Sequence, residues 1–242
     1  MACPQDNCHP GLVDGVREQN GPLVIWEEAV RDLLSCLNVH KSMGPDGIHP
    51  SVMRELADEL AKPLSIIYQQ SWFTGEVPDD CKLANVIHIH KNSRKEDPGN
   101  YKPVRLTSVP GKIMEQFILR AIVKHLQDGQ GIRPSQHRFR RYRTCSTSLI
   151  SFYDQVTHLV GAGKAVDVVY LDFSKAFDTV SHSILLDKLA ARGLDRSTLH
   201  CVRNWLDGRA QRVVVNGAAS SWGQSPVVFL RGLCWGQFCS IF

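Results

Sequence analysis

The feature that most constrains the fold is a nearly continuous apolar run, residues 166–171, followed directly by a carboxylate, Asp172. A run of this kind is typical of a buried strand in an α/β sheet. Ligands and metals usually bind beyond the carboxyl ends of such strands, and a carboxylate there suits a hard cation such as Mg²⁺. A lone Asp at a strand end is more often a turn former or a helix cap, so spacing alone leaves both roles open.

The chain is long enough to fold on its own. Its 242 residues, 43% of them hydrophobic, can bury a substantial core in one large or two small domains. The net charge of +4 is mild, but five arginines fall within eleven residues, at positions 133, 138, 140, 141 and 143. Clustered arginines suit contacts with phosphates, and a solvated charged loop is the equally ordinary alternative.

The cysteine pattern predicts an intracellular protein. The eight cysteines contain no C-x-x-C pair, and the sequence starts with no signal peptide, which indicates reduced thiols in the nucleus or the cytoplasm. The longest apolar runs are too short to span a membrane, so no membrane partner is expected.

Apolar periodicity and turn residues predict a mixed order of helices and strands. The expected elements are helices over 26–39 and 51–73, the second kinked or split by Pro63; strands over 83–90 and 102–106 around a charged tip; helices over 112–126 and 146–160; the strand 166–171; helices over 181–192 and 197–206; and a hairpin that turns at Asn216-Gly217. This order predicts an α/β (α+β) fold.

Four segments carry recognisable motifs. Residues 171–178 read L-D-F-S-K-A-F-D, residues 41–47 read K-S-M-G-P-D-G, residues 100–108 read N-Y-K-P-V-R-L-T-S, and residues 134–139 read P-S-Q-H-R-F. In sequence order they resemble the motifs of reverse transcriptases from non-LTR (LINE-type) retrotransposons, of the CR1-like kind in vertebrate genomes. The resemblance covers roughly residues 26–222.

The resemblance implies the fingers and an incomplete palm of a right-hand polymerase. Residues 26–150 would form a fingers-like region and residues 151–222 part of the palm. Residues 1–25, which are polar and rich in Gly and Pro, would be a linker or a cut end.

The same resemblance implies the chemistry of the palm. In this family two Mg²⁺ ions, held by palm carboxylates, join a DNA primer to an incoming deoxynucleoside triphosphate on an RNA template. Asp172 would be a metal ligand, Phe173 would lend its backbone carbonyl, and Phe177 would exclude ribonucleotides by its bulk. An ordinary core position remains open for Phe177, and a helix cap for Asp178.

Further positions are expected to bind substrates. Lys91 and Lys102 fall where the family places cations against the triphosphate, and Lys102 stands where Arg is usual. The template strand would contact Gln136, Phe139, Arg140 and Arg143.

The sequence also departs from the family. Arg138 and Tyr142 stand where glycines are expected, and Arg105 replaces a serine, which is typical of a decaying copy. Residues 223–242 contain neither the second palm motif nor the Y-x-D-D turn. With suitable synonymous codons, however, another reading frame of these residues gives P-V-T-S-G-V-P-Q-G-S-V-L-G-P, which is the missing palm motif. The tail is therefore expected to be frameshifted.

Three functions follow from this reading. The first is a fragment of an RNA-directed DNA polymerase that is inactive alone, because one carboxylate is too few for two metal ions. The second is a non-catalytic RNA- or DNA-binding protein that keeps the basic finger surface. The third, a phosphatase built on Asp172, is weak because Ser174 stands where a second acid would be needed.

Overall fold

A computed structural model describes residues 23–91, 94–128, 137, 143–171 and 181–224. Of these, residues 23–122 and 194–224 belong to one compact unit, and the others to a second. Each unit is described by itself. Helices and a sheet with parallel and antiparallel pairs together confirm the expected α/β class.

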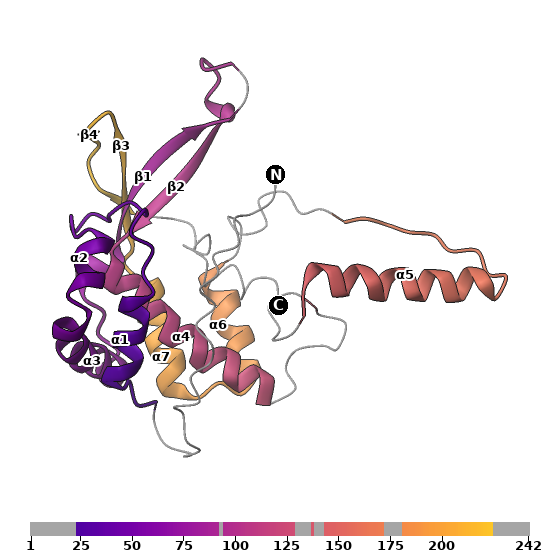
Figure 1. Ribbon diagram of the computed structural model, residues 1–242, viewed down its shortest axis with the longest axis horizontal. Coiled ribbons are helices and arrows are strands. Elements are labelled where there is room, and N and C mark those ends of the chain that lie inside the picture. The colour runs from indigo at the N-terminus through magenta and orange to yellow at the C-terminus, as the bar shows by residue number, and fades with distance from the viewer. Residues whose placement is uncertain (1–22, 92–93, 129–136, 138–142, 172–180, 225–242) are drawn as a thin grey trace. The chain divides into compact units, whose positions relative to one another are not determined.

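Three helices begin the first unit (Figure 1). In α1 (Glu27–Ser35), acidic residues occupy the first turn, and Val30, Leu33 and Leu34 are buried at helical spacing. This apolar stripe packs against α3 (Ala57–Thr74). The short helix α2 (Pro50–Glu55) lies between them in sequence, and its first turn is capped by His49, whose Nδ1 accepts a hydrogen bond from the backbone N–H of Ser51 at 3.2 Å.

The expected helix over 51–73 is split, but not at Pro63. The break falls at Leu56, between α2 and α3, and Pro63 lies inside α3. A proline removes one backbone donor and crowds the carbonyl four residues earlier, yet here the helix continues through it and buries Ala57, Ala61, Tyr68 and Trp72. The burial of this face offsets the local cost. The helix ends at Gly75, which has φ 74°.

The sheet of the first unit is built around strand β1 (Leu83–His90), which follows the 3₁₀ turn Asp79–Lys82. It pairs antiparallel with β2 (Tyr101–Thr107) and parallel with β3 (Ala210–Val215). The short strands β4 (Ala218–Ala219) and β5 (Gly223–Gln224) both pair with β3. Figure 1 shows the β1–β2 hairpin extending away from α1–α3. Both predicted strands and the turn at Asn216-Gly217 are confirmed; the two turn residues have φ 49° and 84°.

Helices α4 (Val109–Asp128) and α7 (Arg196–Leu206) supply much of the core. Within the first unit, α4 buries Ile113, Met114, Phe117, Ile118 and Ile122, while Ala121 is only half-buried. Helix α7 buries Cys201, Val202 and Trp205 and packs against α3. Asp195 caps α7 by accepting a hydrogen bond from the backbone N–H of Thr198 at 2.8 Å.

The second unit contains α5 (Cys145–Gly161) and α6 (His182–Ala191), which confirm two predicted helices. Thr144 and Thr147 form a capping box at the start of α5. Helix α6 buries Leu185 and Leu189 and ends before Gly193, which has φ 77°. Within the described residues, no helix is both long and apolar enough to cross a membrane.

The prediction of a buried strand over 166–171 is wrong. These residues form no strand, and Val169, Tyr170 and Leu171 are 78%, 83% and 80% exposed. A strand needs a hydrogen-bonded neighbour, and the described strands β1–β5 pair only with one another. The apolar composition predicted burial in a sheet, but these residues are largely exposed and pair with no described strand.

Candidate functional site

The Gly-Pro-Asp-Gly loop of residues 44–47 is fixed against the end of β2. A Cβ placed on Gly44 would lie 2.5 Å from the carbonyl carbon of Thr107 and 2.6 Å from the backbone nitrogen of Ser108, so only glycine fits there. The backbone N–H of Gly47 donates to the carbonyl of Gly44 at 3.2 Å, which closes a turn with Pro45 at its second position. The motif thus brings the preceding residues onto the sheet.

Charge interactions join this loop to α4. Burial raises the pKa of Asp46, while a backbone hydrogen bond from Ile48, with N–Oδ1 at 3.5 Å, and the positive charge of Lys112 act in the opposite direction. Burial also lowers the pKa of Lys112; Asp46 opposes this shift, and the nearby charge of Lys41 adds to it. Asp46 and Lys112 are thus partly buried groups of opposite charge, and their electrostatic interaction opposes the pKa shift of each.

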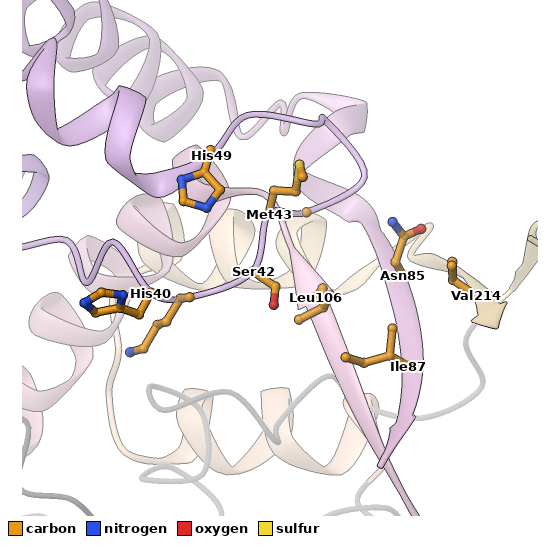
Figure 2. A pocket seen from close by; sticks show the side chains of 10 residues that line it. His40, Ser42, Met43, His49, Asn85, Ile87, Leu106 and Val214 are labelled. Carbon is orange, nitrogen blue, oxygen red and sulfur yellow. The ribbon is translucent and has the colours of Figure 1, made fainter. Parts of the chain in front are cut away.

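A pocket of about 520 Å³ lies between this loop and the sheet. Figure 2 shows Ser42, Met43 and His49 from the loop side and Asn85, Ile87 and Leu106 from the strands. His40, Lys41, Gly44 and Val214 complete the lining. Half of the lining residues are polar or charged, namely His40, Lys41, Ser42, His49 and Asn85, and the others are apolar residues and Gly44.

The strand register places Lys91 and Lys102 on one face of the hairpin. Lys102 pairs with Ile89, and the N–H of Lys91 donates to the carbonyl of Asn100 at 2.7 Å, which continues the same register. Paired residues share a face, as do residues two apart along a strand. The two lysines are therefore diagonal neighbours, with Cα atoms about 7–8 Å apart, and both are exposed.

The same register extends this face to the pocket. On β1 the face carries Asn85, Ile87, Ile89 and Lys91; on β2 it carries Lys102, Val104 and Leu106; on β3 it carries Arg212 and Val214. We call this side of the sheet the lysine face. Four residues of this face also line the pocket on the strand side, namely Asn85, Ile87, Leu106 and Val214. The pocket and both predicted phosphate-binding lysines thus share one surface, and none of the strand residues named on it is acidic.

One row of this face contains an arginine that sequence reasoning missed. Leu106, Asn85 and Arg212 are neighbours across three strands, and the β3–β5 register continues the row to Trp222. The Nε of Arg212 donates to Oδ1 of Asn85 at 2.8 Å, and its guanidinium carbon lies 4.6 Å from the centre of the Trp222 ring. The sequence A-Q-R-V-V-V over 210–215 has no alternation that would have signalled this arginine, and its partner strands are distant in the chain.

The predicted palm residues cannot be placed. Asp172, Phe173 and Phe177 lie outside the described residues, so their roles stay predictions. Where the structure describes the chain, no group of three or more His, Cys, Asp or Glu side chains is arranged to hold a metal ion.

The predicted template contacts are only partly described. Gln136, Phe139 and Arg140 lie outside the described residues. Arg143 belongs to the second unit, where one of its Nη atoms lies 3.3 Å from Nε2 of His137. The Nδ1 of His137 lies in turn 3.0 Å from Oγ1 of Thr147, in the cap of α5. Arg143 is thus linked through His137 to the cap of α5, and its contact with a template stays a prediction.

Comparison with known proteins identifies the family. Residues 89–233, more than half of the chain, match the model of the reverse transcriptase (RNA-dependent DNA polymerase) family. The chain is 29% identical over 195 residues to the RNA-directed DNA polymerase from mobile element jockey of Drosophila melanogaster, covering 80% of this chain and 21% of that protein. It is 28% identical over 204 residues to the Pol polyprotein from type-2 retrotransposable element R2DM of the same organism, covering 84% of this chain and 18% of that protein.

A third relative, the Pol polyprotein from type-1 retrotransposable element R1 of Bradysia coprophila, is 27% identical over 166 residues, covering 67% of this chain and 16% of that protein. The chain thus spans about one fifth of the length of these relatives. The resemblance to non-LTR retrotransposon enzymes is confirmed, while the vertebrate CR1-like subtype stays a prediction. The chain belongs to the reverse transcriptase (RNA-dependent DNA polymerase) family.

Proposed function

We propose that this chain is the fingers and part of the palm of an RNA-directed DNA polymerase from a non-LTR retrotransposon, acting inside the cell, in the nucleus or the cytoplasm. Residues 26–150 would be fingers-like, residues 151–222 part of the palm, residues 1–25 a linker and residues 223–242 a frameshifted tail. The observation that carries the proposal is the pair Lys91 and Lys102, which lie diagonally on one exposed face of the hairpin. Two cations at this spacing suit adjacent phosphates of a deoxynucleoside triphosphate.

The palm residues have proposed roles in the same reaction. Asp172 and the backbone carbonyl of Phe173 would hold Mg²⁺, which supplies charge neutralisation at the phosphates. Phe177 would exclude ribonucleotides by its bulk, and the RNA template would contact Gln136, Phe139, Arg140 and Arg143. A single carboxylate and a carbonyl are too small a donor set for two ions. We therefore propose that these 242 residues by themselves bind substrates but do not extend a primer.

Primer extension tests this function directly. The purified chain would be given an RNA template, an annealed DNA primer, deoxynucleoside triphosphates and Mg²⁺, beside an Asp172→Asn control. We expect template binding without extension in both proteins. Extension by the wild type that Asp172→Asn abolishes would contradict the proposed inactivity and would establish that a complete metal site forms.

The second candidate is a non-catalytic RNA- or DNA-binding protein. The observation that favours it is the positive charge of Lys91, Lys102 and Arg212 on the lysine face, because such surfaces bind phosphodiester backbones without chemistry. The two candidates differ in their response to nucleotides. If Lys91 and Lys102 are triphosphate contacts, deoxynucleoside triphosphates should protect both lysines from acetylation. If they are only strand contacts, an oligonucleotide should protect them and a nucleotide should not.

A further inference from the structure

Arg212 is held from two sides before any ligand binds. Its Nε donates to Oδ1 of Asn85 at 2.8 Å, and its guanidinium carbon lies 4.6 Å from the centre of the Trp222 ring. The side chain is half-buried, and its Nη atoms make no hydrogen bond within the described part of the chain. A guanidinium fixed in this way has already lost much of its rotamer freedom, so less conformational entropy is lost when it binds an anion.

The chemistry around Arg212 favours an anion. None of the strand residues named on the lysine face is acidic, and the neighbours of Arg212 across the sheet are Asn85 and Trp222. The adjacent pocket has apolar walls formed by Met43, Ile87 and Leu106. A charged fork beside an apolar hollow suits a ligand that carries both a phosphate and a flat apolar group.

Arg212 and the lysine pair lie too far apart along the sheet to contact the same phosphate group. Asn85, beside Arg212, and Ile89, beside Lys102, are four residues apart on β1, which corresponds to about 13 Å. The phosphates of one nucleotide lie together at one end of the molecule, so they cannot contact both places. A nucleotide whose triphosphate lies on the two lysines therefore leaves Arg212 to a phosphate of a second molecule, and a nucleic-acid strand carries a phosphate at every nucleotide.

We propose that Arg212 binds a backbone phosphate of a single-stranded nucleic acid that lies along the lysine face, and that Asn85 and Trp222 orient its guanidinium for this contact. The proposal rests on the proposed function in one respect: the strand would be the template. It adds a contact at the end of the lysine face that lies next to the pocket, in addition to the two lysines that were expected from the motifs.

The test measures how strand binding depends on salt. Fluorescein-labelled oligo(U) would be titrated with the full chain at several KCl concentrations, and fluorescence anisotropy would give the dissociation constant. Arg212→Gln should weaken binding roughly tenfold at low salt and lower the slope of log K against log salt by about 0.7, the value for one lost contact with a single strand. Arg203→Gln, which removes an exposed arginine on α7 of the same unit, should leave both quantities unchanged.

Two more variants separate binding from folding. Arg212→Lys keeps the charge, so it should keep the wild-type salt slope while losing part of the affinity. Trp222→Leu removes the stacking partner and should behave in the same way. Thermal unfolding of each variant gives its folded fraction, and the dissociation constants are compared only on that fraction.

The outcomes distinguish this proposal from the proposed function. The role of Arg212 is overturned if Arg212→Gln binds oligo(U) with the wild-type dissociation constant and salt slope, or if the wild type does not bind the strand. In either case, protection of Lys91 and Lys102 by deoxynucleoside triphosphates would still support the polymerase assignment. Tighter binding of oligo(dT) than of oligo(U), lost in Arg212→Gln, would keep the phosphate contact but make DNA the bound strand.

Discussion

Gly44 lies against the backbone of Thr107 so closely that a Cβ on Gly44 would be 2.5 Å from the carbonyl carbon of Thr107. The contact joins the loop of residues 40–49 to the end of β2 and thereby forms one wall of the pocket on the lysine face. Both partners in this contact are backbone, and one belongs to a paired strand, so neither can move aside at low cost.

Gly44→Ala should therefore destabilise the first unit. Insertion of a methyl group into a close backbone contact forces the loop away from the strand, and we expect the free energy of unfolding to fall by about 1–3 kcal/mol. Urea unfolding followed by the fluorescence of the buried Trp72 and Trp205 would measure it. Gly223→Ala, in the same unit, where the nearest atom to a Cβ is the backbone oxygen of Gln211 at 4.0 Å, is the matched control and should change stability by less than about 0.5 kcal/mol. Equal stability of both variants would contradict the role of Gly44.

A buried ion pair gives a second prediction. Arg209 and Glu115 are 4% and 8% exposed, and their closest charged atoms are 3.6 Å apart. Burial lowers the pKa of Arg209, and Glu115 acts in the opposite direction. The Arg209 Nε also donates to the Trp205 carbonyl at 2.8 Å, and the Trp205 ring N–H donates to Glu115 at 3.2 Å. Each member of this cluster thus stabilises the charge or position of another.

Glu115→Leu should leave the guanidinium of Arg209 buried without its counter-charge, at a cost of about 3–5 kcal/mol in the free energy of unfolding. The double variant Glu115→Leu with Arg209→Met removes both charges and should recover much of that loss. A double-mutant cycle by urea unfolding measures the coupling. If the double variant is as unstable as the sum of the single ones, the two charges do not interact.

The fold of the first unit could largely be predicted from the sequence because its signals are local. The alternation over 83–90 and the Asn216-Gly217 turn each depend on residues that are close in the chain, and both were confirmed. The split at Leu56 was missed because Pro63 is the stronger local signal. Burial of α3 against α1 overrides that signal, and such packing cannot be read from a single segment.

The candidate site was less predictable because it depends on partners that are distant in sequence. The pocket joins residues 40–49 to Asn85, Leu106 and Val214, and Arg212 reaches Asn85 across 127 positions. The motifs indicated Lys91 and Lys102 but could not show that both share a face with the pocket. At 166–171 the local apolar pattern was clear, but the prediction failed because a buried strand also needs a neighbouring strand to pair with, which the pattern does not show.

Lys102→Arg gives a prediction about the nucleotide. A guanidinium presents a planar fork to phosphate, whereas an ammonium group is a point charge. If the exposed Lys102 contacts the triphosphate, the substitution should tighten deoxynucleoside triphosphate binding by roughly threefold to tenfold, a gain of about 1 kcal/mol. Quenching of a fluorescent nucleotide analogue would measure the dissociation constant. Lys95→Arg, at an exposed loop position, should have no effect, and an unchanged constant in Lys102→Gln would exclude the contact.

The last prediction concerns alkaline pH. The thiol of Cys201 is fully buried in α7, and burial raises its pKa from 9.0 to about 12. Between these two values the unfolded chain has lost the thiol proton while the folded chain retains it. The unfolded state therefore binds fewer protons, and the free energy of unfolding falls as pH rises through this range. Below pH 9 both states keep the proton, so Cys201 adds no pH dependence there.

Cys201→Ala should remove this component. Between pH 9 and 11, its stability should fall less steeply than that of the wild type, with a difference of up to about 3 kcal/mol accumulated over two pH units. The absolute stability of the variant will also drop, because a smaller side chain leaves a cavity, so the comparison is between slopes and not between values. Cys145→Ala, at an exposed position, should keep the wild-type slope. Parallel pH profiles for Cys201→Ala and the wild type would mean that the Cys201 thiol ionises as readily in the folded chain as in the unfolded one.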